Sequence, residues 1–133
     1  MDASDWISLV DTEGRLSHLY EIDLPLEACD LFYLQIDERG TSVTLGFETS
    51  ILPTNPHPDW SEKPYNTLEF YIEFTEIQDI TIAGWTSSAR TGIDFSTPGG
   101  RSVQVSINRP ESKLHFTAGA SSVTRLRPYL AAR

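Results

Sequence analysis

The chain has 133 residues, of which 39% are hydrophobic and 22% are charged, and its formal net charge is −9. This composition predicts one folded domain over residues 1–133 and argues against a disordered chain. No apolar run is long enough for a transmembrane helix, and the acidic N-terminus lacks the order of a secretory signal. Because the single cysteine, Cys29, excludes an internal disulfide, we expect a cytoplasmic protein.

The charge is distributed unevenly along the chain. Residues 1–79 carry 17 acidic and 3 basic side chains, whereas residues 80–133 carry 2 acidic and 7 basic ones. An acidic protein makes phosphate contacts poorly, so direct binding to nucleic acid is not expected. The charge favours attraction of a basic protein, although carboxylates that only maintain solubility explain it equally well.

The first elements are short. Ser4 and Asp5 can cap a helix that runs through Val10. A turn is expected at residues 11–14, and alternation over residues 19–24 predicts a strand that Pro25 ends.

A β-hairpin follows. Alternation over residues 31–37 places Phe32 and Tyr33 on opposite faces, and a second alternating run over residues 42–48 points Glu48 outward. The connecting residues end at Gly40, which is free to take a positive φ. These features predict two paired antiparallel strands.

Residues 51–66 lose this periodicity and contain four prolines. Prolines cannot donate to a strand ladder, so this segment is expected to cross the surface without a long strand. We expect Trp60 to anchor it by side-chain packing.

The strongest strand pattern lies at residues 67–76, where apolar and polar residues alternate without interruption. Successive strand side chains point to opposite faces, so four of them should enter the core: Leu68, Phe70, Ile72 and Phe74. On the outward face two carboxylates, Glu69 and Glu73, flank Tyr71. This acidic surface with an aromatic centre is the best functional candidate in the sequence.

The remaining strands are shorter. Residues 77–85 should form one with Ile80 and Ile82 inward and Trp85 outward. Further alternating runs lie between turn signals, at residues 93–96, 103–107, 113–118 and 121–127. The spacing predicts an all-β protein: an antiparallel sandwich or partly closed barrel of about 8 to 9 strands, with at most a short N-terminal helix.

The three histidines give little indication of a metal site. His57 and Asp59 would need a further ligand from elsewhere in the chain. His18 and His115 match no metal motif by their spacing. We therefore expect neither a metal nor another cofactor.

Nucleophilic and acid–base catalysis are also not expected. The carboxylates of Glu27 and Asp30 beside Cys29 would raise the pKa of the thiol, which disfavours a reactive thiolate. The α-carbons of Glu69 and Glu73 would lie about 13 Å apart on one strand, wider than glycosidases use. These arguments predict a protein that is not an enzyme.

Four segments follow one another along the middle of the chain: the run Val43-Thr44-Leu45-Gly46-Phe47, the proline-rich segment that ends at Trp60, the run Asn66-Thr67-Leu68-Glu69-Phe70, and the run from Ile80 to Trp85. In this order they resemble the immunity protein 50 family. The resemblance covers residues 31–95 and implies a bacterial protein encoded with a polymorphic toxin. It further implies binding and neutralisation of that cognate toxin, for which a basic nuclease is one candidate.

We therefore expect a protein binder with no membrane contact, and its oligomeric state does not follow from the sequence. Its partner surface should include six outward side chains: Glu69, Tyr71, Glu73, Glu48, Tyr33 and Trp85. A rival interpretation is a carbohydrate- or lipid-binding β-barrel with Trp60, Trp85 and Tyr33 at a pocket mouth. A third is an enzyme that uses two close carboxylates in a cleft.

Overall fold

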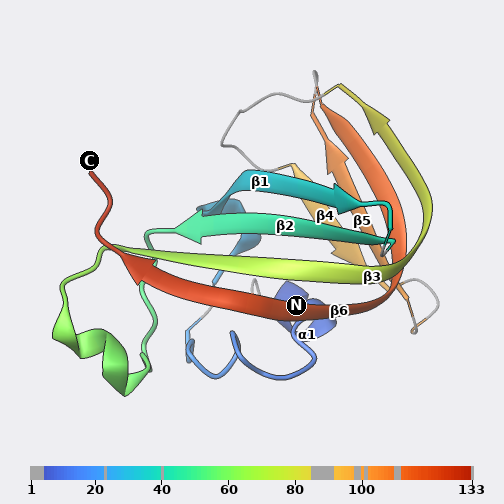
Figure 1. Cartoon of the computed structure of the whole chain (residues 1–133). Helices are drawn as coiled ribbons and strands as arrows, with labels where there is room; N and C mark the ends of the chain where they lie inside the picture. The colour runs from blue at the N-terminus through green and yellow to red at the C-terminus, as the bar shows by residue number, and fades with distance from the viewer. Residues whose placement is uncertain are drawn as a thin grey trace.

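The computed structural model describes residues 5–22, 24–39, 41–84, 92–97, 100, 102–109 and 112–132. They form α1 (Asp5–Val10), two 3-10 helices, η1 (Leu26–Ala28) and η2 (Pro58–Glu62), and six strands: β1 (Cys29–Asp37), β2 (Ser42–Thr49), β3 (Thr67–Ala83), β4 (Ile93–Ser96), β5 (Val103–Asn108) and β6 (Lys113–Tyr129). The strands build one antiparallel sheet in the order β1-β2-β3-β6-β5-β4. Because β1 and β4 remain at its two edges, the sheet is open (Figure 1). No helix in the described ranges is long and apolar enough to cross a membrane.

The sheet is curled by its two longest strands. β3 and β6 have 17 residues each and pair from Thr67 opposite Tyr129 to Ala83 opposite Lys113. The register shifts between Gln78 and Thr81, near two residues with positive φ, Glu76 at 55° and Asp79 at 57°. Such bulges bend a strand and increase its twist. The far halves of both strands thereby carry β5 and β4 behind β1 and β2 (Figure 1).

The inward side chains of β3 fill the space inside this curl. All four predicted core residues are 0% exposed, which confirms the alternation: Leu68, Phe70, Ile72 and Phe74. The ring of Phe70 stacks on Phe47 of β2 at 5.3 Å and on Trp6 of α1 at 5.9 Å. Trp6 also lies 6.0 Å from Phe95 of β4, so the helix links the two halves of the sheet.

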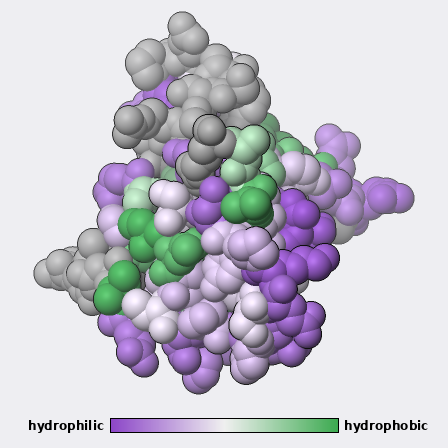
Figure 2. All heavy atoms as spheres, turned by 90° about the vertical axis from the view of Figure 1, so that its left-hand side faces the viewer, coloured by the Kyte–Doolittle hydropathy of each residue, from purple (hydrophilic) through white to green (hydrophobic). Residues whose placement is uncertain are grey.

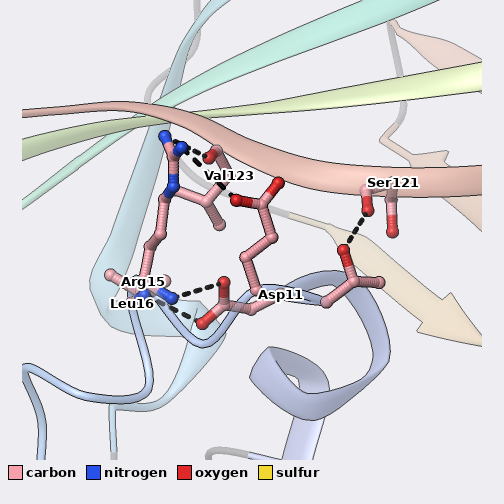
Figure 3. A network of polar contacts seen from close by, with 7 residues as sticks. Asp11, Arg15, Leu16, Ser121 and Val123 are labelled. Atoms are coloured by element: carbon pink, nitrogen blue, oxygen red, sulfur yellow. Dashed lines mark hydrogen bonds and ion pairs between the residues drawn. The ribbon is translucent and has the colours of Figure 1, made fainter.

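A buried carboxylate shapes the turn after α1. Asp11 is 7% exposed and accepts hydrogen bonds from the backbone N–H groups of Arg15, Leu16 and Ser17, at 3.0, 2.8 and 2.8 Å (Figure 3). These bonds satisfy donors that the turn would otherwise leave unpaired.

The same segment covers the edge of β6 beyond its pairing with β5. The Thr12 hydroxyl donates to the carbonyl of Ser121 at 3.0 Å, and the Arg15 guanidinium donates to that of Val123 at 3.4 Å (Figure 3). The Ser121 hydroxyl returns a bond to the carbonyl of Val10 at 3.1 Å. The side chains of Thr12 and Arg15 thus bond backbone carbonyl groups of β6 that an added strand would otherwise use as acceptors.

The predicted count of about 8 to 9 strands, and a sandwich or barrel, are not confirmed, since the described residues give six strands in one open sheet. Two strands were expected at residues 67–76 and 77–85, but the described part of this range forms one strand, β3. Two further strands were expected at residues 113–118 and 121–127, and both belong to the single strand β6. The strand predicted at residues 19–24 is wrong for the described part of that range. Its backbone instead binds the proline-rich segment: the Asn55 N–H donates to the Leu19 carbonyl at 2.9 Å.

Other local predictions are confirmed. The helix at residues 5–10 and the hairpin of β1 and β2 are present, and no strand occurs in residues 51–66. Trp60 is half-buried against the core, 6.0 Å from His57 and 6.4 Å from Tyr65. Gly40 lies outside the described residues, and Thr41 beside it has a φ of 48°.

Ile82 lies opposite Leu114, which is 1% exposed, and paired residues of two strands share a face, so the inward orientation of Ile82 agrees with the register. The side chains of Ile80 and Ile82 are nevertheless 39% and 47% exposed. β2 pairs with β3 only as far as Phe74, so this part of β3 has no β2 beside it to help cover these side chains.

Phe70→Ala is expected to lower the free energy of unfolding by about 3 to 5 kcal/mol, because it opens a cavity in the centre of the aromatic core. Phe32→Ala, at a ring that is 45% exposed, is the matched control and should lose less than about 1 kcal/mol. Equilibrium denaturation in guanidinium measures both. Equal losses in the two variants would contradict the core assignment.

Candidate functional site

A β-bulge in β1 brings two aromatic side chains to the outer face of the sheet. The register with β2 shifts between Leu31 and Tyr33, so Phe32 has no partner residue in β2. Leu31 remains in the core at 3% exposure, whereas Phe32 and Tyr33 are 45% and 37% exposed. The prediction that Phe32 and Tyr33 point to opposite faces is therefore wrong, because the bulge inserts one residue into the alternation.

These rings close over a glycine. Tyr33, Gly46 and Tyr71 are partners across β1, β2 and β3, and a Cβ atom at Gly46 would lie 2.8 Å from both Tyr33 Cβ and Tyr71 Cε2. Tyr71 meets Tyr33 edge-on at 5.6 Å and Phe32 at 5.9 Å, and the Arg125 guanidinium of β6 lies 5.7 Å from its ring centre. We call Phe32, Tyr33, Tyr71 and Arg125 the outer-face cluster.

The carboxylates beside this cluster are bonded within the chain. Glu48 and Glu69 face each other across β2 and β3, and Arg127 of β6 lies opposite Glu69. Glu69 accepts from the Arg127 guanidinium at 3.1 Å and from the Tyr71 hydroxyl at 2.8 Å. Glu48 accepts from the hydroxyl of Tyr129, over whose ring Arg127 lies at 5.0 Å. Each of these two carboxylates therefore has a donor of its own.

These contacts also fix the protonation of the donors. The hydrogen bond to Glu48, together with burial, raises the pKa of Tyr129 to about 12. Burial and the bond to Glu69 raise the pKa of Tyr71, and the bond to Glu69 raises that of Arg127. Near neutral pH the two tyrosines therefore stay neutral and act as donors.

Five of the six predicted partner residues lie on the outer face, and Trp85 lies outside the described residues. Tyr33, Tyr71, Glu69 and Glu48 meet as described above, while Glu73 is half-buried one row away, between Thr44 and Ser122. Glu69 was expected as an open carboxylate, but it is only 5% exposed because Arg127 and Tyr71 engage it.

Four residues of this surface were not predicted from the sequence: Phe32, Arg125, Arg127 and Tyr129. The two arginines had a usable signal, because they stand two positions apart in an alternating run. Nothing in the sequence indicated that their strand would pair with the strand of Glu69. The bulge that turns Phe32 outward had no signal either.

Other candidate chemistry is weak. In the described ranges no group of three or more His, Cys, Asp or Glu side chains is placed to hold a metal ion. His57 Nδ1 is 3.6 Å from Asp59, and both side chains are exposed. Burial, with smaller contributions from Asp30 and Glu27, raises the pKa of the Cys29 thiol to about 12, so this thiol is a poor nucleophile.

The interior of the sheet is filled by aromatic rings. Phe47, Phe70, Phe74 and Phe116 are 0% exposed, and the Phe74 and Phe116 rings lie 5.3 Å apart. A ligand barrel would need space where these rings pack. On the side drawn in Figure 2, hydrophobic residues form small groups between hydrophilic ones, as on an ordinary water-exposed surface.

These features define a class: an all-β protein with an open antiparallel sheet and a surface cluster of aromatic and paired charged side chains. Within that class, the family model for immunity protein 50 matches residues 14–129, so the chain belongs to this family of immunity proteins. The resemblance drawn from residues 31–95 is thereby confirmed and extended on both sides. No curated protein and no solved structure matches the chain significantly.

Glu69→Lys should lower the free energy of unfolding by about 2 kcal/mol, because it sets an ammonium group against Arg127 and removes the acceptor of the Tyr71 hydroxyl. Glu73→Lys on the same strand face is the control, with an expected change below about 0.5 kcal/mol. Chemical denaturation compares the two variants. A Glu69→Lys protein as stable as the control would refute the structural role of this carboxylate.

The raised pKa of Tyr129 predicts a loss of stability at alkaline pH. The neutral phenol is favoured in the folded state, so its contribution is complete below its ordinary pKa of 10.0 and is lost as pH rises towards about 12. In Tyr129→Phe, unfolding free energy should fall less over this interval. Denaturation at a series of pH values tests this, and a phenolate difference titration against Tyr129→Phe with a midpoint at 10.0 would contradict it.

Proposed function

We propose that the protein binds a cognate toxin through the outer-face cluster and neutralises it without a catalytic activity of its own. Membership of an immunity protein family supports a toxin as the partner. The observation that carries the choice of surface is the group of the exposed Phe32 and Tyr33 rings with the half-buried Tyr71 ring and Arg125, assembled from three strands. Aromatic and arginine side chains are the types that dominate binding energy in protein interfaces.

The cluster is held in place before any partner arrives. The edge-on contacts of the Tyr71 ring with Phe32 and Tyr33 restrict the rotamers of these rings, and the Tyr71 ring also lies close over Gly46. The Tyr71 hydroxyl is fixed by Glu69, which is fixed by Arg127. The side chains of the cluster would therefore lose little conformational entropy when a partner binds, which favours a higher affinity at a given contact area.

The carboxylates have a different role in this proposal. Since Glu69 is ion-paired with Arg127 within the chain, attraction of a partner depends on the other acids and on the net charge of −9. This field would speed the approach of a basic toxin, such as a nuclease, and have less effect on its dissociation. We propose that the encounter takes place in the bacterial cytoplasm, where the free thiol of Cys29 remains reduced.

The rival interpretations have less support. A carbohydrate- or lipid-binding barrel needs an open interior, whereas Phe47, Phe70 and Phe116 fill this one. An enzyme with paired carboxylates could use Glu48 and Glu69, but their oxygens are already occupied by Tyr129, Tyr71 and Arg127. Protein binding therefore remains the function that the geometry supports best.

Tyr33→Ala should weaken binding to the toxin module encoded beside this gene by about 2 kcal/mol, or roughly thirtyfold, because it removes an exposed ring from the centre of the cluster. Calorimetry with an inactivated toxin measures the affinity, and growth of cells that co-express active toxin reports neutralisation. Ile22→Ala, at a side chain that is 51% exposed and outside the cluster, should leave both unchanged. Undiminished affinity for Tyr33→Ala would place the binding surface elsewhere.

A further inference from the structure

The open edges of the sheet differ in their ability to accept another strand. The β6 edge is occupied by the Thr12 and Arg15 side chains, and β4 is only 4 residues long. β3 loses β2 as a neighbour beyond Phe74, but its positive-φ residues Glu76 and Asp79 interrupt the edge that follows. Bulges of this kind obstruct regular pairing. β1, with 9 residues at the end of the sheet, is the edge with the fewest such obstacles.

The second half of β1 has the regular geometry that strand addition needs. From Tyr33 to Asp37 its residues pair with Gly46 to Ser42 without a register shift. In the described part of the chain, β2 is the only strand paired with β1. A hollow of about 450 Å³ borders residues 35–39, and Ile36 is 38% exposed there. An edge of the sheet and an exposed apolar side chain thus lie together.

The charge around this edge selects the kind of strand. Residues 29–38, which are β1 and the residue after it, contain three carboxylates and neither lysine nor arginine, and the following Arg39 lies 3.6 Å from Asp37. A second copy of the chain would bring a second set of carboxylates to the same edge, which like-charge repulsion disfavours. A basic strand would be attracted instead.

We propose that β1 accepts an extended, basic segment of the toxin as an added strand beside Tyr33–Asp37. This inference rests on the proposed function and deepens it, because such a strand would lie next to Phe32 and Tyr33 of the outer-face cluster. Its backbone would bond the β1 edge, its outward lysine or arginine side chains would approach the carboxylates, and aliphatic side chains on its other face would lie beside Ile36. Main-chain pairing gives affinity in this mode, and the alternate side chains give specificity.

The first test needs no toxin. A short capped peptide of alternating lysine and valine is titrated into the full-length isotope-labelled protein, with amide shifts and hydrogen exchange followed by nuclear magnetic resonance. The expected result is slower amide exchange and shifted signals at residues 33–37. A peptide N-methylated at its valines should bind at least about tenfold more weakly, since it lacks the strand donors. A glutamate–valine peptide should also bind at least about tenfold more weakly.

Two glutamine variants give a matched comparison. Gln35→Lys adds a cation to β1 and should weaken binding of the basic peptide about fivefold, the effect of one charge contact near a protein surface. Gln78→Lys adds the same cation to an exposed position of β3 and should have no such effect. Equal weakening by both variants would show only a general charge effect and would overturn the assignment to β1.

The second test uses the inactivated toxin module encoded beside this gene. Exchange protection at residues 33–37 in the complex would support strand addition. A complex that forms and neutralises the toxin without this protection would overturn strand addition while leaving the proposed function intact. If the module does not bind, the proposed function fails and the peptide titration decides the inference alone. Peptide shifts confined to another edge, association through a second copy, or equal binding of the N-methylated peptide would overturn it.

Discussion

The antiparallel pairing of β3 with β6 is the contact on which the rest of the structure depends. It joins residues that are 62 positions apart at one end, Thr67 with Tyr129, and 30 positions apart at the other, Ala83 with Lys113. It also connects the β1–β2 hairpin to the β5–β4 pair. Closing so long a segment has an entropic cost, which the buried face of β3 offsets through Phe70 and Phe74. The same pairing brings the acidic part of the chain to the basic part, as Glu69 and Arg127 show.

Two irregularities of the strands assemble the outer-face cluster. The bulge at Phe32 puts consecutive aromatic residues of β1 on the outer face, and a shift in β6 pairs Tyr71 with Arg125 but Ile72 with Val123. A sheet without them would alternate strictly and would place fewer large side chains together outside. The cluster thus depends on breaks in the pattern that builds the core.

The sequence predicted the features that depend on local alternation. The buried face of β3, the β1–β2 hairpin and the short helix all follow from periodicity or capping, and the order of segments indicated the family. Strand neighbours did not follow, because alternation assigns a side chain to a face but names no partner strand. The pairing of Glu69 with Arg127 was therefore hidden, and an acid expected to face a partner is instead bonded within the chain.

This internal bonding separates the forces that attract a partner from those that hold it. Because Glu69 is already only 5% exposed and is paired with Arg127, it adds little further desolvation penalty when the neighbouring rings are covered. In the proposed strand addition, Asp37 and Glu38 lie at an edge that an exposed strand could otherwise join. Their repulsion would keep identical edges apart and favour a cationic strand, so the same charges would limit self-association and select the partner.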